Sequence, residues 1–242
     1  MPADVRRCPS AQDLAEQVAA AFVAAIADAQ QQDRVPSVAL TGGTIARTIH
    51  ETVAASTDAH LVDWSRVDVW FGDERFLPAD DPDRNARQAA EALLDRLPFD
   101  PARIHPMPAS DGPHPSVDEA ATAYGEELRA HGGDRFDVVM LSLGPDGHVA
   151  SLFPGHPRLD VHDAVAVAVT DSPKPPPERV SLTLDALNRT REVWFLVSGS
   201  GKADAAAIAL SGTADVHDAP SAGVRGQERT VWFLDEDAAA RL

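Results

Sequence analysis

Short apolar segments alternate with helix-like segments along most of the chain, and this alternation limits the possible folds more than any other feature. The strand-like segments cover residues 37–40, 67–71, 137–141, 164–169, 180–184, 193–197 and 230–234. The helix-like segments run from a predicted N-cap at Ser10 to Ile26 and over residues 45–55, 85–97, 117–130 and 202–210. This alternation predicts an α/β fold, with a mostly parallel, Rossmann-like sheet and helices on both of its faces.

The strand predicted at 137–141 is almost continuously apolar, which is typical of a strand buried on both faces of a sheet. The proline-rich segment 172–177 is too short to link two domains and predicts a stiff loop before the strand at 180–184. Neither an internal repeat nor a shift in composition divides the sequence. We therefore expect a single domain over residues 1–242.

Acidic residues outnumber basic ones, since 21 Lys and Arg stand against 38 Asp and Glu and give a formal charge of 21 − 38 = −17. A field of this sign repels polyanions, so we expect neither nucleic acid nor a membrane as a partner. It also repels a phosphorylated metabolite unless cations gather locally. No apolar run reaches the roughly 18 residues that a membrane span needs, and residues 1–16 lack an apolar signal core.

The chain contains one cysteine, Cys8, which has no partner within the chain for a disulfide. Structural disulfides belong to oxidising compartments, so we expect a protein of the reducing cytoplasm. No activating group adjoins Cys8 in the sequence, and we assign it no role.

Ligands of parallel sheets bind beyond the carboxyl ends of the strands, so the loops that follow strands carry the candidate chemistry. In the first such loop, Thr41, Gly42, Gly43 and Thr44 offer hydroxyls and backbone N–H groups at the start of a helix. This arrangement suits a phosphate group, although an ordinary tight turn with Thr44 as the N-cap is the alternative interpretation.

A second glycine-rich loop, 198–202, ends in Lys202, which is one of two lysines in the chain. The other is Lys174. Leu196 and Ala203 occupy positions where a Walker A motif requires Gly and Ser or Thr, so the loop does not indicate a P-loop. A cation at a helix N-terminus opposes the helix dipole, which weakens the interpretation of Lys202 as a merely solvated residue.

Two further loops carry titratable groups. In the loop 72–75, Asp73 and Arg75 could orient a substrate and pair with an anion, or they could form a solvated charged turn. In the loop 143–148, two glycines and a proline precede His148, which can take up a proton near neutral pH. A capping or core histidine is the alternative.

Several other classes of site lack their required spacing. The sequence has no CxxC, HExxH or EF-hand pattern, so no metal site is expected. It also lacks the Gly-x-Ser-x-Gly pattern of serine hydrolases and a complete dinucleotide fingerprint.

Taken together and in order, the loops resemble those of the 6-phosphogluconolactonase family, within the wider group of sugar-phosphate isomerase and deaminase folds. The segments that carry this resemblance are 41–44, 73–75, 144–155, 177–183 and 201–203. The segment Leu152-Phe153-Pro154-Gly155 distinguishes the chain from glucosamine-6-phosphate deaminases, which typically have Asn-Glu-Pro-Gly there. Two positions depart from the family pattern: Thr44-Ile45-Ala46 replaces Ser-Thr-Pro, and Arg84 replaces a serine before Asn85.

The resemblance implies hydrolysis of 6-phospho-D-glucono-1,5-lactone to 6-phospho-D-gluconate, the second step of the oxidative pentose phosphate pathway, without a metal or other cofactor. It implies that His148 is the general base on water, with Asp73 and Arg75 as further catalytic groups. The implied phosphate-binding residues are Thr41, Gly42, Gly43, Thr44, Arg179 and Lys202. A sugar-phosphate deaminase or isomerase and a non-catalytic sugar-phosphate sensor are the alternatives.

Overall fold

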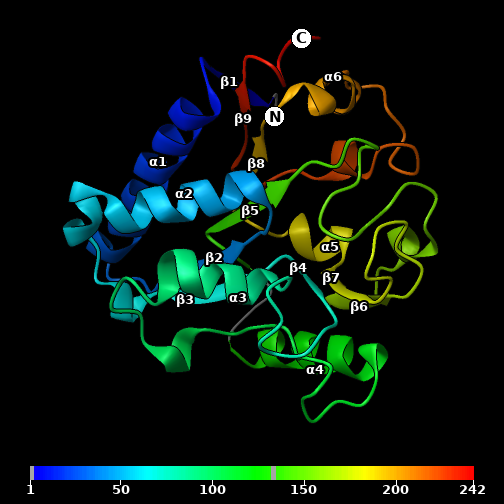
Figure 1. Cartoon of the computed structure of the whole chain (residues 1–242), viewed down its shortest axis with the longest axis horizontal. Coiled ribbons are helices and arrows are strands. Elements are labelled where there is room, and N and C mark those ends of the chain that lie inside the picture. Colours follow the sequence, from blue (N-terminus) through cyan, green and yellow to red (C-terminus); the bar gives the residue numbers. More distant parts are fainter. Residues whose placement is uncertain (1–2, 132–134) are drawn as a thin grey trace.

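The computed structural model describes residues 3–131 and 135–242, and its centre is a six-stranded sheet in the order β1-β9-β8-β5-β2-β3 (Figure 1). Every neighbouring pair in this sheet is parallel. The strands are β1 (Asp4–Cys8), β2 (Ser37–Leu40), β3 (Asp68–Phe71), β5 (Val138–Ser142), β8 (Glu192–Val197) and β9 (Arg229–Asp235). The parallel α/β fold predicted from the sequence is confirmed.

Helices cover the central sheet on its two faces. Helix α1 (Ala11–Gln31) packs on α2 (Thr44–Ala55), and both contact the sheet. The chain crosses the sheet in the opposite direction at α6 (Ala203–Leu210), so the right-handed rule for parallel crossovers places α6 on the other face (Figure 1). None of the helices in the described ranges has both the length and the apolar character that a membrane span requires.

A smaller antiparallel sheet of three strands, in the order β4-β7-β6, lies beside the central sheet. Its strands are β4 (Asp73–Arg75), β6 (Ala166–Val169) and β7 (Arg179–Leu182). Helix α4 (Val117–Ala130) packs against it, and α5 (Leu184–Leu187) directly follows β7. The strands predicted at 164–169 and 180–184 therefore form, but they pair antiparallel and outside the main sheet.

Three other predictions from local sequence differ from the structure. Strand β1 was not predicted because it is short and half polar, and its partner β9 lies at the far end of the sequence. Strand β4 lies where the sequence predicts a loop, because its three residues are all charged. The helix predicted at 85–97 consists of α3 (Asn85–Ala89) followed by a π-helical turn over Ala90–Leu94.

Short 3₁₀ segments complete the chain, at Thr57–Leu61, Trp64–Arg66, Pro101–Arg103, Pro157–Asp160, Ser200–Lys202 and Pro220–Gly223. The predicted N-cap of α1 is confirmed, since the Ser10 hydroxyl accepts a hydrogen bond of 3.1 Å from the Asp13 backbone N–H. The apolar stripe of that helix, which includes Leu14 and Phe22, is buried against the core.

The order of the strands reverses between β2 and β5. The chain leaves β2 towards β3 on one side, whereas β5, on the other side of β2, leads to β8 and β9. The loops that follow β2 and β5 consequently diverge and leave a crevice at the carboxyl ends of the strands. This crevice is the expected place for a ligand.

The only tyrosine in the chain, Tyr124 of α4, connects this helix to the edge strand β3. Its hydroxyl accepts a hydrogen bond of 2.9 Å from the Phe71 backbone N–H and donates one of 3.1 Å to the Phe71 carbonyl. Both residues are fully buried, so no water replaces these bonds.

We expect Tyr124→Phe to lower the free energy of unfolding by about 2 kcal/mol, because two buried backbone groups lose their hydrogen-bond partner while the ring packing stays. Urea denaturation followed by tryptophan fluorescence measures this change. Tyr124→Leu, which also removes the ring, should lower stability further. An unchanged unfolding midpoint for Tyr124→Phe would contradict the bridging role of the hydroxyl.

Candidate active site

A cavity of about 530 Å³ lies at the carboxyl ends of the strands, where the loops after β2 and β5 diverge. All nine residues predicted from the sequence line it: Thr41, Gly42, Gly43, Thr44, Asp73, Arg75, His148, Arg179 and Lys202. The wall also includes Asn85, Lys174, Ser142 and Ser198, which the sequence did not assign to the site.

The loop after β2 presents backbone rather than side-chain bulk to the cavity. Gly43 is the N-cap of α2 and has a φ of 104°, a conformation that favours glycine, so the alternative in which Thr44 caps the helix is wrong. A Cβ on Gly42 would lie 1.8 Å from Oδ1 of Asn85. Gly42 is therefore required for the close approach of Asn85 to this loop.

Asn85 joins the two charged residues of β4. Its amide nitrogen donates to the Asp73 carbonyl at 2.8 Å and to Asp73 Oδ1 at 3.3 Å, and its Oδ1 accepts from the Arg75 guanidinium at 2.7 Å. The second carboxylate oxygen of Asp73 accepts a hydrogen bond of 2.6 Å from the Ser151 hydroxyl. Asp73 and Arg75 consequently have fixed orientations in the cavity wall, and these depend on contacts between segments that are distant in the sequence.

Glu74, between these two residues, points away from the cavity and is buried. Its carboxylate accepts hydrogen bonds from the backbone N–H groups of Arg75, Asn85 and Ala86 at 2.7 to 2.9 Å and so fixes the start of α3. Arg84 lies 3.6 Å from the same carboxylate. The arginine that replaces the family's serine is therefore part of the support beneath Asn85 and does not line the cavity.

His148 lies in the loop after β5 and forms a pair with Asp146. Its Nδ1 is 2.5 Å from Asp146 Oδ1, while Nε2 has no hydrogen bond within the described residues. A Cβ on Gly144 would lie 1.9 Å from His148 Nδ1 and 2.4 Å from the Asp146 carboxylate. The glycine at this position thus makes room for the pair.

Burial lowers the pKa of His148 below its ordinary value of 6.5, and the adjacent carboxylate of Asp146 only partly opposes this effect. Asp146 is itself half-exposed; burial raises the pKa of its carboxyl, but the charge and hydrogen bond of His148 outweigh this and hold the pKa below 3.8. His148 is therefore neutral at neutral pH, and a carboxylate next to it stabilises the imidazolium form. This is the combination that a general base requires.

The other glycine-rich loop begins directly after β8. Asp235, the last residue of β9, accepts hydrogen bonds of 2.6 Å from the Ser198 hydroxyl and 3.0 Å from the Gly199 backbone N–H. Gly199 has a φ of 92° and starts the 3₁₀ turn that places Lys202 in the cavity wall. Burial lowers the pKa of the Lys202 ammonium, and the charge of Lys174 lowers it further.

Arg179 and Arg75 are opposite one another in the β4–β7 pair, so two guanidinium groups begin from adjacent backbone positions. Burial lowers the pKa of Arg179, and the nearby charge of Arg75 contributes in the same direction. Together with the two lysines, these side chains form a local group of cations in a chain whose net charge is −17.

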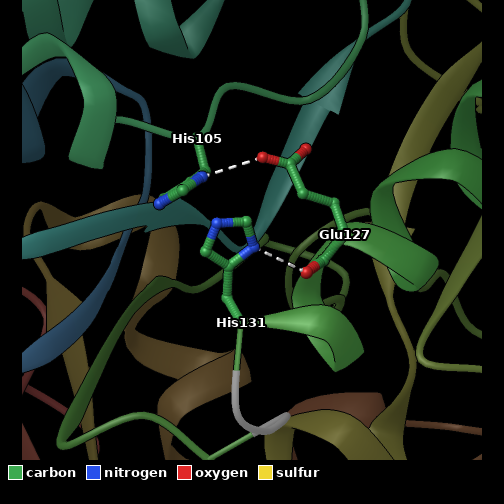
Figure 2. Close-up of side chains that lie close together, drawn as sticks. All are labelled: His105, Glu127 and His131. Atoms are coloured by element: carbon green, nitrogen blue, oxygen red, sulfur yellow. Dashed lines mark hydrogen bonds and ion pairs between the residues drawn. The ribbon is translucent and has the colours of Figure 1, made fainter.

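Outside the cavity, His105, Glu127 and His131 offer three potential metal-ligating atoms within 4.8 Å of one another (Figure 2). His105 Nδ1 is 2.8 Å from the Glu127 carboxylate, and His131 Nδ1 is 3.0 Å from the Glu127 backbone carbonyl, whereas His105 Nε2 is buried without a hydrogen-bond partner within the described residues. The His105 ring also stacks on Trp70 at a centroid distance of 4.0 Å. These contacts fit a role in packing the C-terminal end of α4.

The fold and the cavity define a class of protein: an α/β protein with a cavity at a strand-order reversal, lined by cations, glycine backbone and a neutral histidine. The chain belongs to the family described as glucosamine-6-phosphate isomerases/6-phosphogluconolactonase, whose family model matches residues 9–232. The resemblance inferred from the loops is confirmed.

Individual relatives agree with this assignment. The chain is 49% identical over 237 residues to a 6-phosphogluconolactonase of Streptomyces coelicolor, covering 95% of this chain and 90% of the relative. The crystal structure of a 6-phosphogluconolactonase from Thermotoga maritima matches with a TM-score of 0.84 and 27% identity, over 96% of this chain and 99% of the other. A monomeric glucosamine-6-phosphate deaminase, at 16% identity, shares the fold with a TM-score of 0.83, over 99% of this chain and 100% of the other.

We expect NMR titration of the His148 ring to give a pKa below 6.5, and Asp146→Asn to move it lower still, because the substitution removes the carboxylate that stabilises the imidazolium. Asp58→Asn, at an exposed helix start outside the cavity, is the control and should leave the titration unchanged. A pKa that rises in Asp146→Asn would show that the two side chains are not paired in solution.

Proposed function

We propose that this chain hydrolyses 6-phospho-D-glucono-1,5-lactone to 6-phospho-D-gluconate, with His148 as the general base. The observation that carries the mechanism is the neutral, half-buried His148, held by Asp146 in a cavity that also gathers cations. The identity to lactonases over most of the chain supports the reaction, as does Leu152-Phe153-Pro154-Gly155, where the deaminases typically differ.

In this mechanism, Nε2 of His148 removes a proton from a water molecule as the water oxygen attacks C1 of the lactone. The resulting imidazolium is stabilised through Nδ1 by the carboxylate of Asp146. The tetrahedral intermediate then collapses, the bond between C1 and the ring oxygen breaks, and the imidazolium returns the proton to that oxygen. The products are a hydroxyl on the sugar chain and a carboxylic acid, which ionises.

Asp73 and Arg75 act on the lactone end of the substrate. Because Ser151 and Asn85 hold the Asp73 carboxylate, it can orient a sugar hydroxyl without reorganising during the reaction. Asn85 likewise holds Arg75, whose positive charge is suited to the negative charge that develops on the carbonyl oxygen.

The phosphate is bound by the start of α2 and by cations. Backbone N–H groups in the loop formed by Thr41, Gly42, Gly43 and Thr44 favour an anion at the positive end of the helix dipole. Lys202 adds a charge that has no ion pair within the described residues, and Arg179 adds another to the same wall. No step in this mechanism requires a metal or another cofactor.

A phosphorylated sugar lactone is accordingly the proposed partner, and the strongly negative net charge argues against nucleic acid. We place the reaction in the cytoplasm. The buried free thiol of Cys8, whose pKa is raised by burial, supports a reducing compartment.

We expect His148→Asn to lower kcat at least about a hundredfold after the rate of uncatalysed hydrolysis is subtracted, because the substitution removes the group that accepts the proton from water.

In the unmodified protein, kcat/KM should fall as the pH falls through the pKa of His148, below 6.5, since protonation abolishes the base. A pH-stat assay that subtracts spontaneous hydrolysis measures both. Release of ammonia from glucosamine 6-phosphate would instead identify a deaminase.

Gly144→Ala and Gly201→Ala form a matched pair. The new methyl group at position 144 would overlap the His148 ring, so we expect kcat to fall at least about tenfold with a small change in KM. The methyl group at position 201 meets nothing within 4 Å, and that variant should fold with the same unfolding midpoint and bind phosphate nearly as tightly. Full activity in folded Gly144→Ala would rule out the proposed position of His148.

A further inference from the structure

Both lysines of the chain, Lys174 and Lys202, line the same cavity. They come from distant parts of the fold, since Lys202 follows β8 and Lys174 lies in the loop between β6 and β7. Neither ammonium group has a hydrogen bond or an ion pair in the described ranges 3–131 and 135–242. Two cations that make no ion pair and line the same cavity are an arrangement that an anionic ligand would stabilise, and among the carboxylates of the described residues only Asp146 partly offsets the charge at Lys202.

The loop that carries Lys174 is held in place by Arg179. The Nη2 atom of Arg179 donates to the carbonyl oxygens of Lys174 at 3.1 Å and Pro175 at 3.2 Å, and its Nε donates to the carbonyl of Pro176 at 3.3 Å. Arg179 is buried at the start of β7, whereas Lys174 is exposed at the rim. The guanidinium is thus largely committed to the backbone of the proline loop.

The loop is also stiff by composition. Prolines at 173 and 175–177 restrict the backbone on both sides of Lys174 and reduce the conformational freedom that ligand binding would otherwise remove. The Ser172 hydroxyl donates a hydrogen bond of 2.9 Å to the Lys174 carbonyl and accepts one of 3.3 Å from its N–H. The backbone of Lys174 is therefore fixed before any ligand arrives.

Lys174 lines the same cavity as His148 and Lys202. Burial is the main cause that lowers the pKa of Lys202 and of His148, and the positive charge of Lys174 contributes in the same direction to both, less to His148 than the opposing effect of Asp146. The Lys174 ammonium therefore acts on both the phosphate-binding side and the catalytic side of the cavity.

We propose that Lys174 binds the substrate phosphate together with Lys202, and that Arg179 is a positioning residue that acts mainly by holding the Lys174 loop. This inference rests on the proposed function and changes one part of it: the second cation on the phosphate is Lys174 rather than Arg179. Above the pKa of His148, where the imidazole is neutral with or without the Lys174 charge, reaction at the neutral lactone end should not depend on Lys174.

The test compares 6-phosphogluconolactone with unphosphorylated glucono-1,5-lactone as substrates of the full chain. We expect Lys174→Ala to raise KM for the phosphorylated lactone about tenfold or more, as for the loss of a charge-assisted hydrogen bond, and to leave kcat/KM for the unphosphorylated lactone within about twofold. Arg66→Ala, which removes an exposed arginine outside the cavity, is the matched control and should change neither value.

A double-mutant cycle separates positioning from direct binding. If Arg179 acts through Lys174, Arg179→Ala raises KM in the unmodified chain but adds little when Lys174 is already alanine. Independent binding of phosphate by the two residues would multiply their effects on KM, and that outcome would overturn the positioning role. Arg179→Lys, which keeps the charge but not the planar set of donors, should behave more like Arg179→Ala than like the unmodified chain.

The pH profile supplies a readout that loop packing alone would not change. Removing the Lys174 charge should move the acid limb of kcat/KM to higher pH, because one cation that disfavours the imidazolium of His148 is lost. An unmodified chain that hydrolyses neither lactone would refute the proposed function. A chain that hydrolyses the phosphorylated lactone with the same KM after Lys174→Ala would refute only the role of Lys174.

Discussion

The reversal of strand order between β2 and β5 is the constraint on which the cavity depends. Crossovers between parallel strands are right-handed, and β3 lies on one side of β2 while β5, β8 and β9 lie on the other. The loops that follow β2 and β5 therefore turn to opposite faces of the sheet and leave a gap between them. One side of the gap supplies glycine backbone and the start of α2, and the other supplies the rigid turn with His148. The proposed phosphate site therefore uses both sides of the reversal, because Lys202 follows β8 on the same side as His148.

The small antiparallel sheet completes the cavity through a buried carboxylate. Glu74 of β4 is buried, and its carboxylate fixes the first turn of α3. Asn85 in that turn can therefore hold Asp73 and Arg75, the residues on either side of Glu74, in the cavity wall. Side chains alternate between the two sides of a strand, so in β4 the central Glu74 supports the structure while Asp73 and Arg75 line the cavity. The Arg84 guanidinium lies beside the Glu74 carboxylate and donates a hydrogen bond to the Met107 carbonyl, which explains how the chain accommodates an arginine where the family has serine.

The sequence was sufficient to predict the parallel sheet and the residues at the ends of its strands, because periodicity and glycine placement are local signals. It was insufficient for β4, whose pairing with β7 joins segments about a hundred residues apart, and for Asn85, whose position depends on that pairing. Lys174 could have been found, since a lysine is rare in this arginine-rich chain. The sequence predicts only a stiff loop around Lys174, and the fold is what brings Lys174 into the same cavity as Lys202.

The presence of the only two lysines in one cavity also gives this protein an unusual chemical reactivity. Lys174 and Lys202 carry the only side-chain ammonium groups in the sequence, so acylation of side chains by amine-directed reagents is directed to the cavity wall. The lowered pKa of Lys202 increases its fraction of nucleophilic free amine at a given pH. A bound phosphate would shield both groups, and the extent of acylation at these two side chains therefore measures how much of the cavity is occupied.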